Sequence, residues 1–272
     1  MDEQRRRIRE DLSGLLRGEV RCDGLTVALY ATDASLYQVE PLGVVYPRDR
    51  DDLVALVRYA ADKGIPLTPR GAGSQVAGGA LGSGLIVDFT RHMRQIELLE
   101  DGLVWAEAGA TLHELNARLR PHGRYFPPDP ANADVTTLGG MLGVDAAGSR
   151  SVRVGSTRDH VHRIEMVLAN GHAMDFGVEP VELNASGQSA PRGSSDAHQG
   201  GAAAIGDETV EGHEAVAAKR DLLRRLADLL RQGEPLIERY QPANLVRNVS
   251  GYCVRGVLSG GHLRMPRLLV GS

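Results

Sequence analysis

The residues with the clearest chemical potential are glycines and other small residues, gathered in three segments at 70–79, 136–141 and 145–149. Glycine lets backbone N–H groups turn inward and approach a ligand closely. Consecutive N–H groups in a turn form a concavity that suits a phosphate or pyrophosphate. A cofactor with a large flat ring and a pyrophosphate would explain why several such loops are needed. The alternative is that these small residues serve only tight turns and close strand packing.

Two common nucleotide-binding loops fit the first segment poorly. Gly71 and Gly73 follow a strand-like run, and Asp88 ends a later apolar run, as in a Rossmann fingerprint. The third glycine of that fingerprint would fall at Val76, however, and the site needs a helix that begins at the loop. Residues 77–84 are instead typical of a loop. A Walker A loop is excluded because no Gly-Lys-Ser/Thr follows.

Histidine and cysteine give weaker signals. His160 and His162 are two residues apart, which would place both on one strand face, but no third ligand stands at a metal-site spacing. Hydrogen-bonded or solvated roles are expected for the histidines, and no metal site is predicted. The two cysteines, Cys22 and Cys253, are too few for a disulfide framework or a Cys-rich metal site.

Composition narrows the class of protein. The 272 residues include 31 Lys and Arg against 35 Asp and Glu, a formal charge of −4, which argues against a nucleic-acid partner. The charged N-terminus, 1–11, is not followed by the apolar run of a secretory signal. No stretch approaches the ~20 apolar residues that span a bilayer. A cytoplasmic protein is expected, and contact with the periphery of the inner membrane through a missing partner or segment stays open.

Periodicity predicts two helices near the N-terminus. Residues 2–17 carry apolar side chains on one stripe, formed by Ile8, Leu12, Leu15 and Leu16. A second helix begins at Asp49 or Asp51, either of which can cap it, and ends near Gly64. Strand-like runs are found at 43–47, 65–69 and 85–88.

Turn and capping signals organise the rest. Glu100-Asp101-Gly102 predicts one hairpin, and Asn170-Gly171 predicts a second with a type I′ turn. Thr111 and Glu114 form a capping box before a helix. The run 267–270 is strand-like. A later charged helix is expected to carry on one face Leu222, Leu226, Leu229 and Leu230.

Six segments in order resemble one known domain. They are Pro41–Pro47, Pro69–Gln75, Phe126–Pro130, Thr137–Met141, Ala147-Gly148 and Gly155–Asp159. This order is similar to the FAD-binding domain of the vanillyl-alcohol oxidase / p-cresol methylhydroxylase (PCMH-type) family, well over 25–178 and fairly over 235–272. The branch it resembles most is that of the FAD-linked D-2-hydroxy-acid dehydrogenases, with cytochrome-type D-lactate dehydrogenase, the glycolate oxidase flavoprotein subunit and D-2-hydroxyglutarate dehydrogenase. Tyr30–Ser35 and Arg247–Tyr252 resemble long forms fused to an iron–sulfur domain.

The resemblance implies an α+β fold of two lobes that holds FAD between them, without a Rossmann fold. The implied pyrophosphate loop is Arg70, Gly71, Ala72, Gly73, Ser74 and Gln75. The implied flavin and ribityl lining is Asp129, Pro130, Thr136, Thr137, Gly139 and Gly140. The implied floor is Ala147, Gly148, Gly155, Thr157 and Asp159. Ser74 stands where relatives with covalent flavin have His, so non-covalent FAD is expected. Asp145 replaces an Asn that relatives often carry, which puts that contact in doubt.

The resemblance also implies a reaction. In a complete enzyme, FAD would take a hydride from the α-carbon of a D-2-hydroxy acid such as D-lactate, glycolate or D-2-hydroxyglutarate, while a general base takes the hydroxyl proton. Electrons would leave to a quinone, a cytochrome or an iron–sulfur protein. Two alternatives stay open: a non-catalytic module that keeps the FAD fold, and an FAD-dependent reductase of another substrate.

The end of the chain matters for this expectation. In the family a Gly-Ser like Gly271-Ser272 is followed by an acidic residue and Gly-Thr-Leu. The cap domain, the catalytic base and any iron–sulfur ligands would lie beyond it, so a truncated chain without a cap is expected and no catalytic residue is identified. The expected divisions are a helical segment at 1–40, the FAD-binding domain at 41–178, a disordered polar insertion at 184–213, and a helix with the start of the next family segment at 214–272.

Overall fold

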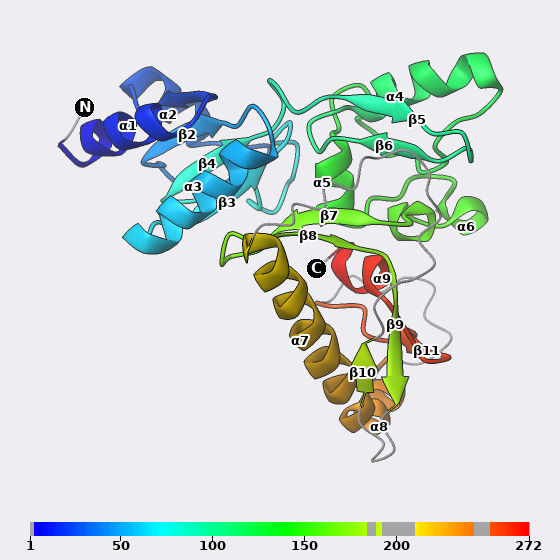
Figure 1. The fold of residues 1–272 in the computed structure, drawn as a ribbon. Helices are drawn as coiled ribbons and strands as arrows, with labels where there is room; N and C mark the ends of the chain where they lie inside the picture. Colours follow the sequence, from blue (N-terminus) through cyan, green and yellow to red (C-terminus); the bar gives the residue numbers. More distant parts are fainter. Residues whose placement is uncertain (1–2, 184–188, 192–209, 242–250, 272) are drawn as a thin grey trace.

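A computed structural model describes residues 3–183, 189–191, 210–241 and 251–271. Its helices and strands fall into three groups (Figure 1). An N-terminal lobe and a second lobe lie side by side, and a third group lies beneath both, reached through the hairpin of β7 (Ile164–Val167) and β8 (Ala173–Phe176). Within the described ranges, no helix is both long enough and apolar enough to cross a membrane.

The N-terminal lobe is a small sheet with helices on both faces. Its elements are α1 (Glu3–Leu15), β1 (Glu19–Arg21), α2 (Gly24–Tyr30), β2 (Gly43–Tyr46), α3 (Arg50–Lys63), β3 (Leu67–Arg70) and β4 (Leu85–Asp88). The strand order is β1-β2-β4-β3, with β1 antiparallel to β2 and the other pairs parallel. One face packs Val45, Leu85 and Val87 against α1 and α3. The other face carries a smaller apolar cluster that includes Ile86.

The two N-terminal helices begin and end largely where the sequence predicts. Asp49, and not Asp51, caps α3, since its side chain accepts the Asp52 N–H at 3.1 Å, and Gly64 ends the helix at φ 65°. On α1, the buried row is Ile8, Leu12 and Leu16, spaced by four. The prediction that Leu15 shares this row is wrong, because at the last helical residue it lies on the border of the row and is 50% exposed.

The second lobe is built around a hairpin and three short helices. Its elements are β5 (Ile96–Leu98), β6 (Val104–Ala106), α4 (Leu112–Leu119), η1 (Arg120–His122), α5 (Leu138–Gly143), α6 (Ser151–Val154) and η2 (Thr157–His160). The predicted hairpin is confirmed, with Gly102 at φ 84° in its turn. The capping box of Thr111 and Glu114 is also confirmed at the start of α4. The core of this lobe comprises Ala110, Leu112, Leu115, Leu119, Leu138, Met141 and Ala146.

The third group packs a long helix on a second sheet. Its elements are β7 (Ile164–Val167), β8 (Ala173–Phe176), β9 (Val178–Leu183), β10 (Ser189–Pro191), α7 (Val210–Gln232), α8 (Glu234–Tyr240), β11 (Leu258–Ser259), β12 (His262–Arg264) and α9 (Met265–Leu269). The sheet order is β10-β9-β12-β11, all antiparallel. Apart from β10 and the start of α7, the insertion predicted at 184–213 lies outside the described residues. So do positions 247–250 of the predicted family segment.

Several local predictions in this group are wrong. The hairpin at Asn170-Gly171 forms, but only Gly171 has a positive φ, so the turn is not type I′. The Gly171 N–H donates to Leu168 O at 2.8 Å, which closes a three-residue loop instead. The strand-like run at 267–270 is mostly helical, within α9. His160 lies in η2 and not on a strand with His162.

The buried face of α7 also differs from the prediction. Leu223, Ala227 and Leu230 are buried against the sheet, and Leu226 packs beside them. Leu222 and Leu229, which were expected on the same face, are 40% and 66% exposed. Leucine spacing alone fits two overlapping faces of this helix, and the sheet selects one of them.

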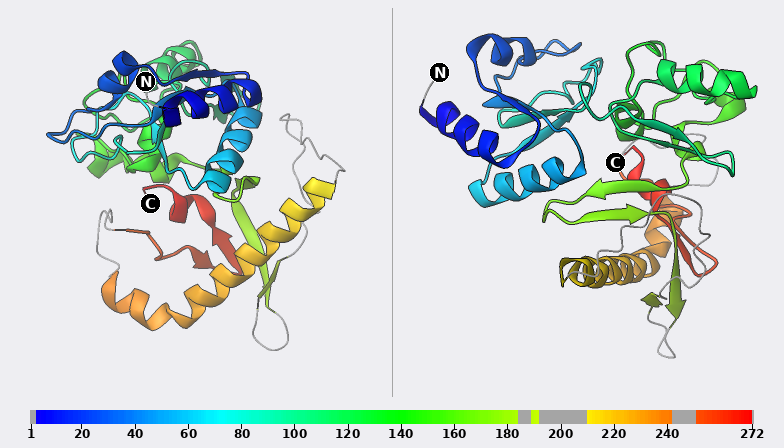
Figure 2. Two further views of the ribbon diagram at one scale, coloured as in Figure 1. Left: turned by 90° about the vertical axis from the view of Figure 1, so that its left-hand side faces the viewer. Right: turned by 45° about the horizontal axis from the view of Figure 1, so that its top comes forward.

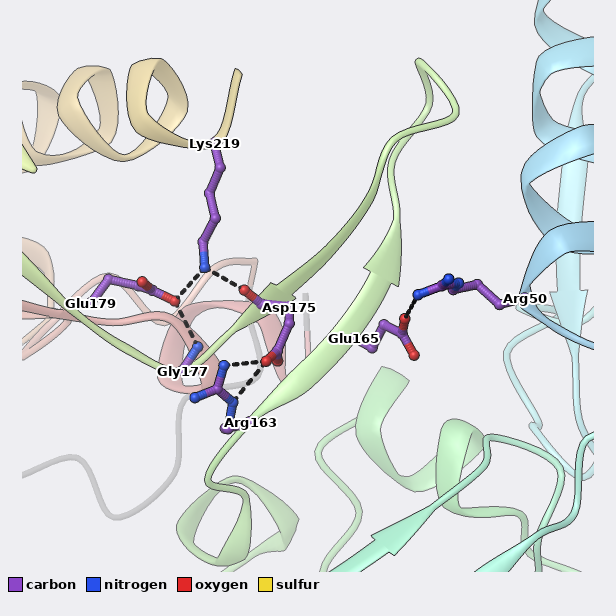
Figure 3. A network of polar contacts seen from close by, with 7 residues as sticks. All are labelled: Arg50, Arg163, Glu165, Asp175, Gly177, Glu179 and Lys219. Carbon is purple, nitrogen blue, oxygen red and sulfur yellow. Dashed lines mark hydrogen bonds and ion pairs between the residues drawn. The ribbon is translucent and has the colours of Figure 1, made fainter. Parts of the chain in front are cut away.

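Polar contacts fasten α7 to the strands (Figure 3). The Lys219 ammonium donates to Asp175 O at 2.5 Å and to Glu179 Oε1 at 2.8 Å. Asp175 also accepts from Arg163 Nε at 2.8 Å. On the opposite side, Arg50 of α3 lies 3.2 Å from Glu165 of β7, which ties the hairpin to the N-terminal lobe. The hairpin is therefore held from both sides.

Candidate cofactor-binding site

The loop at 71–84 connects β3 to β4 through turns and bends, without a helix. The two strands are parallel neighbours, yet no helix begins at the loop whose N-terminus could hold a pyrophosphate. The sequence argument against a Rossmann site therefore agrees with the described structure. Any anion held here must be bound by the loop itself.

The N–H groups of this loop are available. Within the described residues, none of the backbone N–H groups of 71–79 has an acceptor. The loop is nevertheless fixed in place, because Gly73 O accepts the Ala34 N–H at 3.0 Å and Gly73 takes φ 65°. Ala72, Ser74 and Gln75 are exposed. A fixed loop with unpaired donors is the arrangement that binds an anion through the backbone.

The first loop meets the second segment at one close approach. A Cβ atom added at Gly71 would stand 2.2 Å from Thr137 Oγ1. Thr137 is 3% exposed and caps α5 through the Gly140 N–H at 3.2 Å. Only glycine allows this contact, so the fold brings the segments at 70–75 and 136–140 together.

The N–H groups of the second segment are already engaged. The Gly139 N–H donates to Ala108 O at 2.8 Å, and the Gly140 N–H donates to the Thr137 hydroxyl. The Thr136 hydroxyl donates to Asn132 O at 2.7 Å. Residues 136–140, together with Asp129 and Pro130, are called the wall of the candidate site. Residues 136–140 leave few backbone donors for a ligand.

Asp129 lies against Gly148. A Cβ atom at Gly148 would stand 2.2 Å from both Asp129 O and Asp129 Oδ1. The Asp129 carboxylate accepts from Arg150 Nε at 2.9 Å and from the Ser149 hydroxyl at 3.2 Å. Partial burial alone would raise the pKa of Asp129, but these hydrogen bonds outweigh it and hold the pKa below its ordinary 3.8. Pro130 follows in the same half-buried turn.

The predicted floor contains backbone N–H groups without an acceptor and, beneath them, the buried side chain of Thr157. The N–H groups of Ala147, Gly148 and Ser149 have no acceptor within the described residues. Thr157 is 2% exposed and donates its hydroxyl to Ala146 O at 2.6 Å, so it supports the floor from below. Asp159 accepts the Ser156 N–H at 2.9 Å in a capping box. A Cβ at Gly155 would stand 2.3 Å from that carboxylate.

A buried ion pair under the floor was not assigned from the sequence. Asp145 has φ 48°, is 1% exposed, and accepts the Arg158 N–H at 2.9 Å. Arg158 Nη1 lies 3.4 Å from Asp145 Oδ2, and Arg158 Nε donates to Val270 O at 3.1 Å. The Gly271 N–H donates to Leu142 O at 2.8 Å. The sequence signals were the positions of Asp145, Arg158 and Gly271 in the family segments, and none of these indicated an ion pair.

A second buried network supports the first loop. Tyr30 donates its hydroxyl to Asp88 Oδ2 at 2.5 Å, and Tyr46 donates to Tyr30 at 3.0 Å. Burial raises the pKa of the Tyr30 hydroxyl well above its ordinary value, and the bond to Asp88 adds to the shift. The Arg70 guanidinium stacks on the Tyr30 ring at 4.9 Å. The end of β4 and the loop after β3 are therefore linked.

Close contacts link the predicted segments in two places. Gly71 lies against Thr137, and Gly148 lies against Asp129. Two stretches, 71–75 and 147–148, offer N–H groups that have no acceptor within the described chain. Thr157 supports the second stretch through its bond to Ala146 O.

Comparison with known proteins gives one family match. A family model described as an FAD binding domain matches residues 41–177. These residues contain β2 to β8 and every predicted site residue.

Two curated relatives are similar in sequence. D-2-hydroxyglutarate dehydrogenase of Escherichia coli (strain K12) is 41% identical over 166 residues, which cover 59% of this chain and 16% of that protein. Glycolate oxidase subunit GlcD of Bacillus subtilis (strain 168) is 32% identical over 154 residues, which cover 55% of this chain and 33% of that protein. The chain therefore spans between a sixth and a third of the length of these relatives.

Solved structures share the fold. Alkyldihydroxyacetonephosphate synthase matches with a TM-score of 0.57 and 20% identity, over 65% of this chain and 38% of that chain. At this identity the likeness concerns the arrangement of the backbone.

Proposed function

The chain belongs to the FAD binding domain family through residues 41–177, about half of its length, and from this premise we propose where it holds the cofactor. The pyrophosphate lies against the unpaired N–H groups of 71–75 and 147–148. The ribityl chain and ring lie along the wall made by Asp129, Pro130 and 136–140. Gly155, Thr157 and Asp159 support the floor.

One observation carries this proposal. A Cβ at Gly71 or Gly148 would overlap Thr137 or Asp129, so glycine is required where the backbone is drawn together. Both glycines adjoin stretches whose N–H groups have no acceptor among the described residues. Two anionic phosphate groups joined by a phosphoanhydride bridge suit two such sets of backbone donors. The residues present fit a pyrophosphate.

We further propose that the complete enzyme oxidises a D-2-hydroxy acid, such as D-lactate, glycolate or D-2-hydroxyglutarate. The printed names of the relatives support this substrate class. Bound FAD supplies a two-electron acceptor for such a reaction. This chain contributes the cofactor-binding site. Its loops bind the phosphates, its wall orients the ring, and its packed floor excludes water. A quinone, a cytochrome or an iron–sulfur protein is the proposed acceptor of the electrons.

Ser74 supports non-covalent binding. The side chain is exposed at the position where covalently linked relatives are expected to carry His, and a serine hydroxyl does not form that link. We therefore propose a dissociable FAD. We also propose residues 41–178 as the FAD-binding domain, preceded by the helical segment at 1–40, whose helix α1 packs into the core of the N-terminal lobe.

The experiment is a titration of the purified chain with FAD. Quenching of flavin fluorescence that saturates at one FAD per chain, and that is reversed by dialysis in denaturant, is the expected result. Absence of any uptake, both by this chain and by a version extended to the length of the relatives, would overturn the proposal. Turnover of D-2-hydroxy acids with an artificial acceptor, measured on the extended version, then tests the substrate class. Oxidation of NADPH without a hydroxy acid would favour a reductase instead.

A further inference from the structure

We propose that Arg70 is a positioning residue for the anion-binding loop, held in turn by Tyr30 and Asp88, and not itself a ligand of the phosphates. This inference rests on the proposed function, in which the loop at 71–75 binds the phosphates of FAD. Its central measurement is made without FAD, so the two can fail separately.

The side chain of Arg70 is turned toward the protein. Its Nη2 donates to Thr32 O at 2.9 Å, and its Nη1 lies 3.4 Å from both Tyr30 O and Ala80 O. Thr32 and Tyr30 belong to the segment beneath the loop, and Ala80 belongs to the far end of the loop. One guanidinium therefore joins both ends of the loop to the segment below it.

The loop is shaped around this guanidinium. A Cβ added at Gly73 would stand 2.6 Å from Arg70 Nη2, and Gly73 also needs its positive φ of 65°. Gly73 O accepts the Ala34 N–H at 3.0 Å, so that carbonyl points down toward the segment at 30–34. Because the Gly73 carbonyl is engaged below the loop, while the N–H groups of 71–75 have no acceptor among the described residues, the loop is left with donors for an anion.

Tyr30 and Asp88 fix the support. The Arg70 Cζ lies 4.9 Å from the centre of the Tyr30 ring, within the range of a cation–π contact. The Tyr30 hydroxyl is held by Asp88, which is 4% exposed. Asp88 is itself fixed by the N–H and hydroxyl of Thr90, both at 2.7 Å. The stack therefore rests on a rigid strand end and not on a mobile side chain.

The conservative variant Arg70→Lys separates the two roles. An ammonium keeps the positive charge that a phosphate ligand would need, but it lacks the planar fork that reaches three carbonyls. A positioning role therefore predicts that Arg70→Lys behaves like Arg70→Met. A phosphate-ligand role predicts that Arg70→Lys behaves like the wild type.

The decisive measurement is amide hydrogen exchange, in the FAD-free chain, at Ala34 and Leu81, whose N–H groups donate to Gly73 O at 3.0 Å and to Gly78 O at 3.2 Å and therefore report whether the loop stays in place. We expect both Arg70 variants to exchange about tenfold faster there, and to bind FAD about tenfold more weakly, because charge-assisted hydrogen bonds are lost. Tyr30→Leu should follow in the same direction, and Tyr30→Phe, which keeps the ring, should change less. Arg118→Lys, on the exposed face of α4, is the matched control and should change neither quantity.

Global destabilisation is controlled with Ile8→Val, a core change in α1 remote from the loop. It should lower Tm without changing exchange at Ala34 and Leu81 or FAD affinity. Unchanged exchange in Arg70→Met and Arg70→Lys would overturn the proposal. So would wild-type affinity in Arg70→Lys beside lost affinity in Arg70→Met. If the wild-type chain takes up no FAD but the Arg70 variants still exchange faster, the positioning role of Arg70 is supported and the proposed function is refuted.

Discussion

Arg158 and Asp145 form a buried ion pair beneath the floor of the candidate site, with Nη1 3.4 Å from Oδ2 and side chains 7% and 1% exposed. The same guanidinium also donates to Val270 O. The pair therefore joins three stretches of chain: the end of α5, the η2 turn, and the segment after α9. Both side chains are almost completely buried, so the two charges depend on each other.

Removing one partner of this pair should be costly. Arg158→Met leaves the Asp145 carboxylate buried, and breaking a buried pair costs about 3–5 kcal/mol. Asp145→Asn leaves the Arg158 cation buried without its counter-charge and should therefore also be destabilising, although the amide oxygen and Val270 O remain as acceptors for the guanidinium. Urea unfolding measures both. Arg224→Met, which breaks a pair exposed by about half on α7, should cost less than about 1 kcal/mol. Equal costs in Arg158→Met and Arg224→Met would contradict a buried role.

Gly71→Val should abolish FAD uptake. The added side chain collides with Thr137, which is buried and cannot retreat, so the first loop must move away from the second segment. Fluorescence titration with FAD measures the loss. The matched control is Gly143→Ala in α5, where an added Cβ has nothing within 4 Å. Full uptake by Gly71→Val would show that the close approach is not part of the cofactor-binding site.

Asp129 should make stability depend on pH in acid. Its pKa lies below 3.8 in the folded chain because Arg150 and Ser149 donate to it. A lowered pKa means that the stabilising contribution is fully present above the ordinary value and is lost as the pH falls through the folded value. The Tm difference between wild type and Asp129→Asn should therefore shrink below pH 3.8. Asp62→Asn, which removes an exposed carboxylate of α3, is the control variant.

Tyr59 should act in the opposite direction in alkali. Burial raises the pKa of its hydroxyl to about 12, and the hydrogen bond to Asp11 at 2.9 Å adds to the shift. The stabilisation is present below the ordinary value of 10.0 and is lost as the pH rises toward about 12. Phenolate absorbance should show this late ionisation. Tyr59→Phe should remove it, whereas Tyr252→Phe, 59% exposed, should leave it unchanged.

Local signals in the sequence predicted much of the fold. Thr111 with Glu114, and Asp49 with Gly64, mark helix ends that depend on neighbouring residues only, and these predictions hold. The failures occur where a distant element decides. Leu222 was expected to be buried, but the sheet under α7 selects Leu223 instead. Asn170 suits two kinds of turn, and the longer loop forms.

The site was predictable in its backbone and not in its side chains. Glycine content located the loop at 70–79, and the order of six segments identified the family, which the match over 41–177 confirms. The assignments of individual ligand contacts stay predictions. The inward turn of Arg70 depends on Thr32, 38 residues away, and the bond that holds Arg158 beside Asp145 depends on Val270, 112 residues away. No local pattern encodes such contacts.

The hydrogen bond from Arg158 to Val270 also affects when the site can be completed during translation. The two residues are 112 positions apart. A ribosome adds about 5–20 residues per second, so Val270 is synthesised roughly 6–22 s after Arg158. During that interval the loop at 70–79 has already been synthesised, but Arg158 beneath the floor still lacks its bond to Val270 O. Under the proposed function, coenzyme that meets the nascent polypeptide early finds the first loop without a braced floor, and the complete binding site forms only after Val270 has been translated.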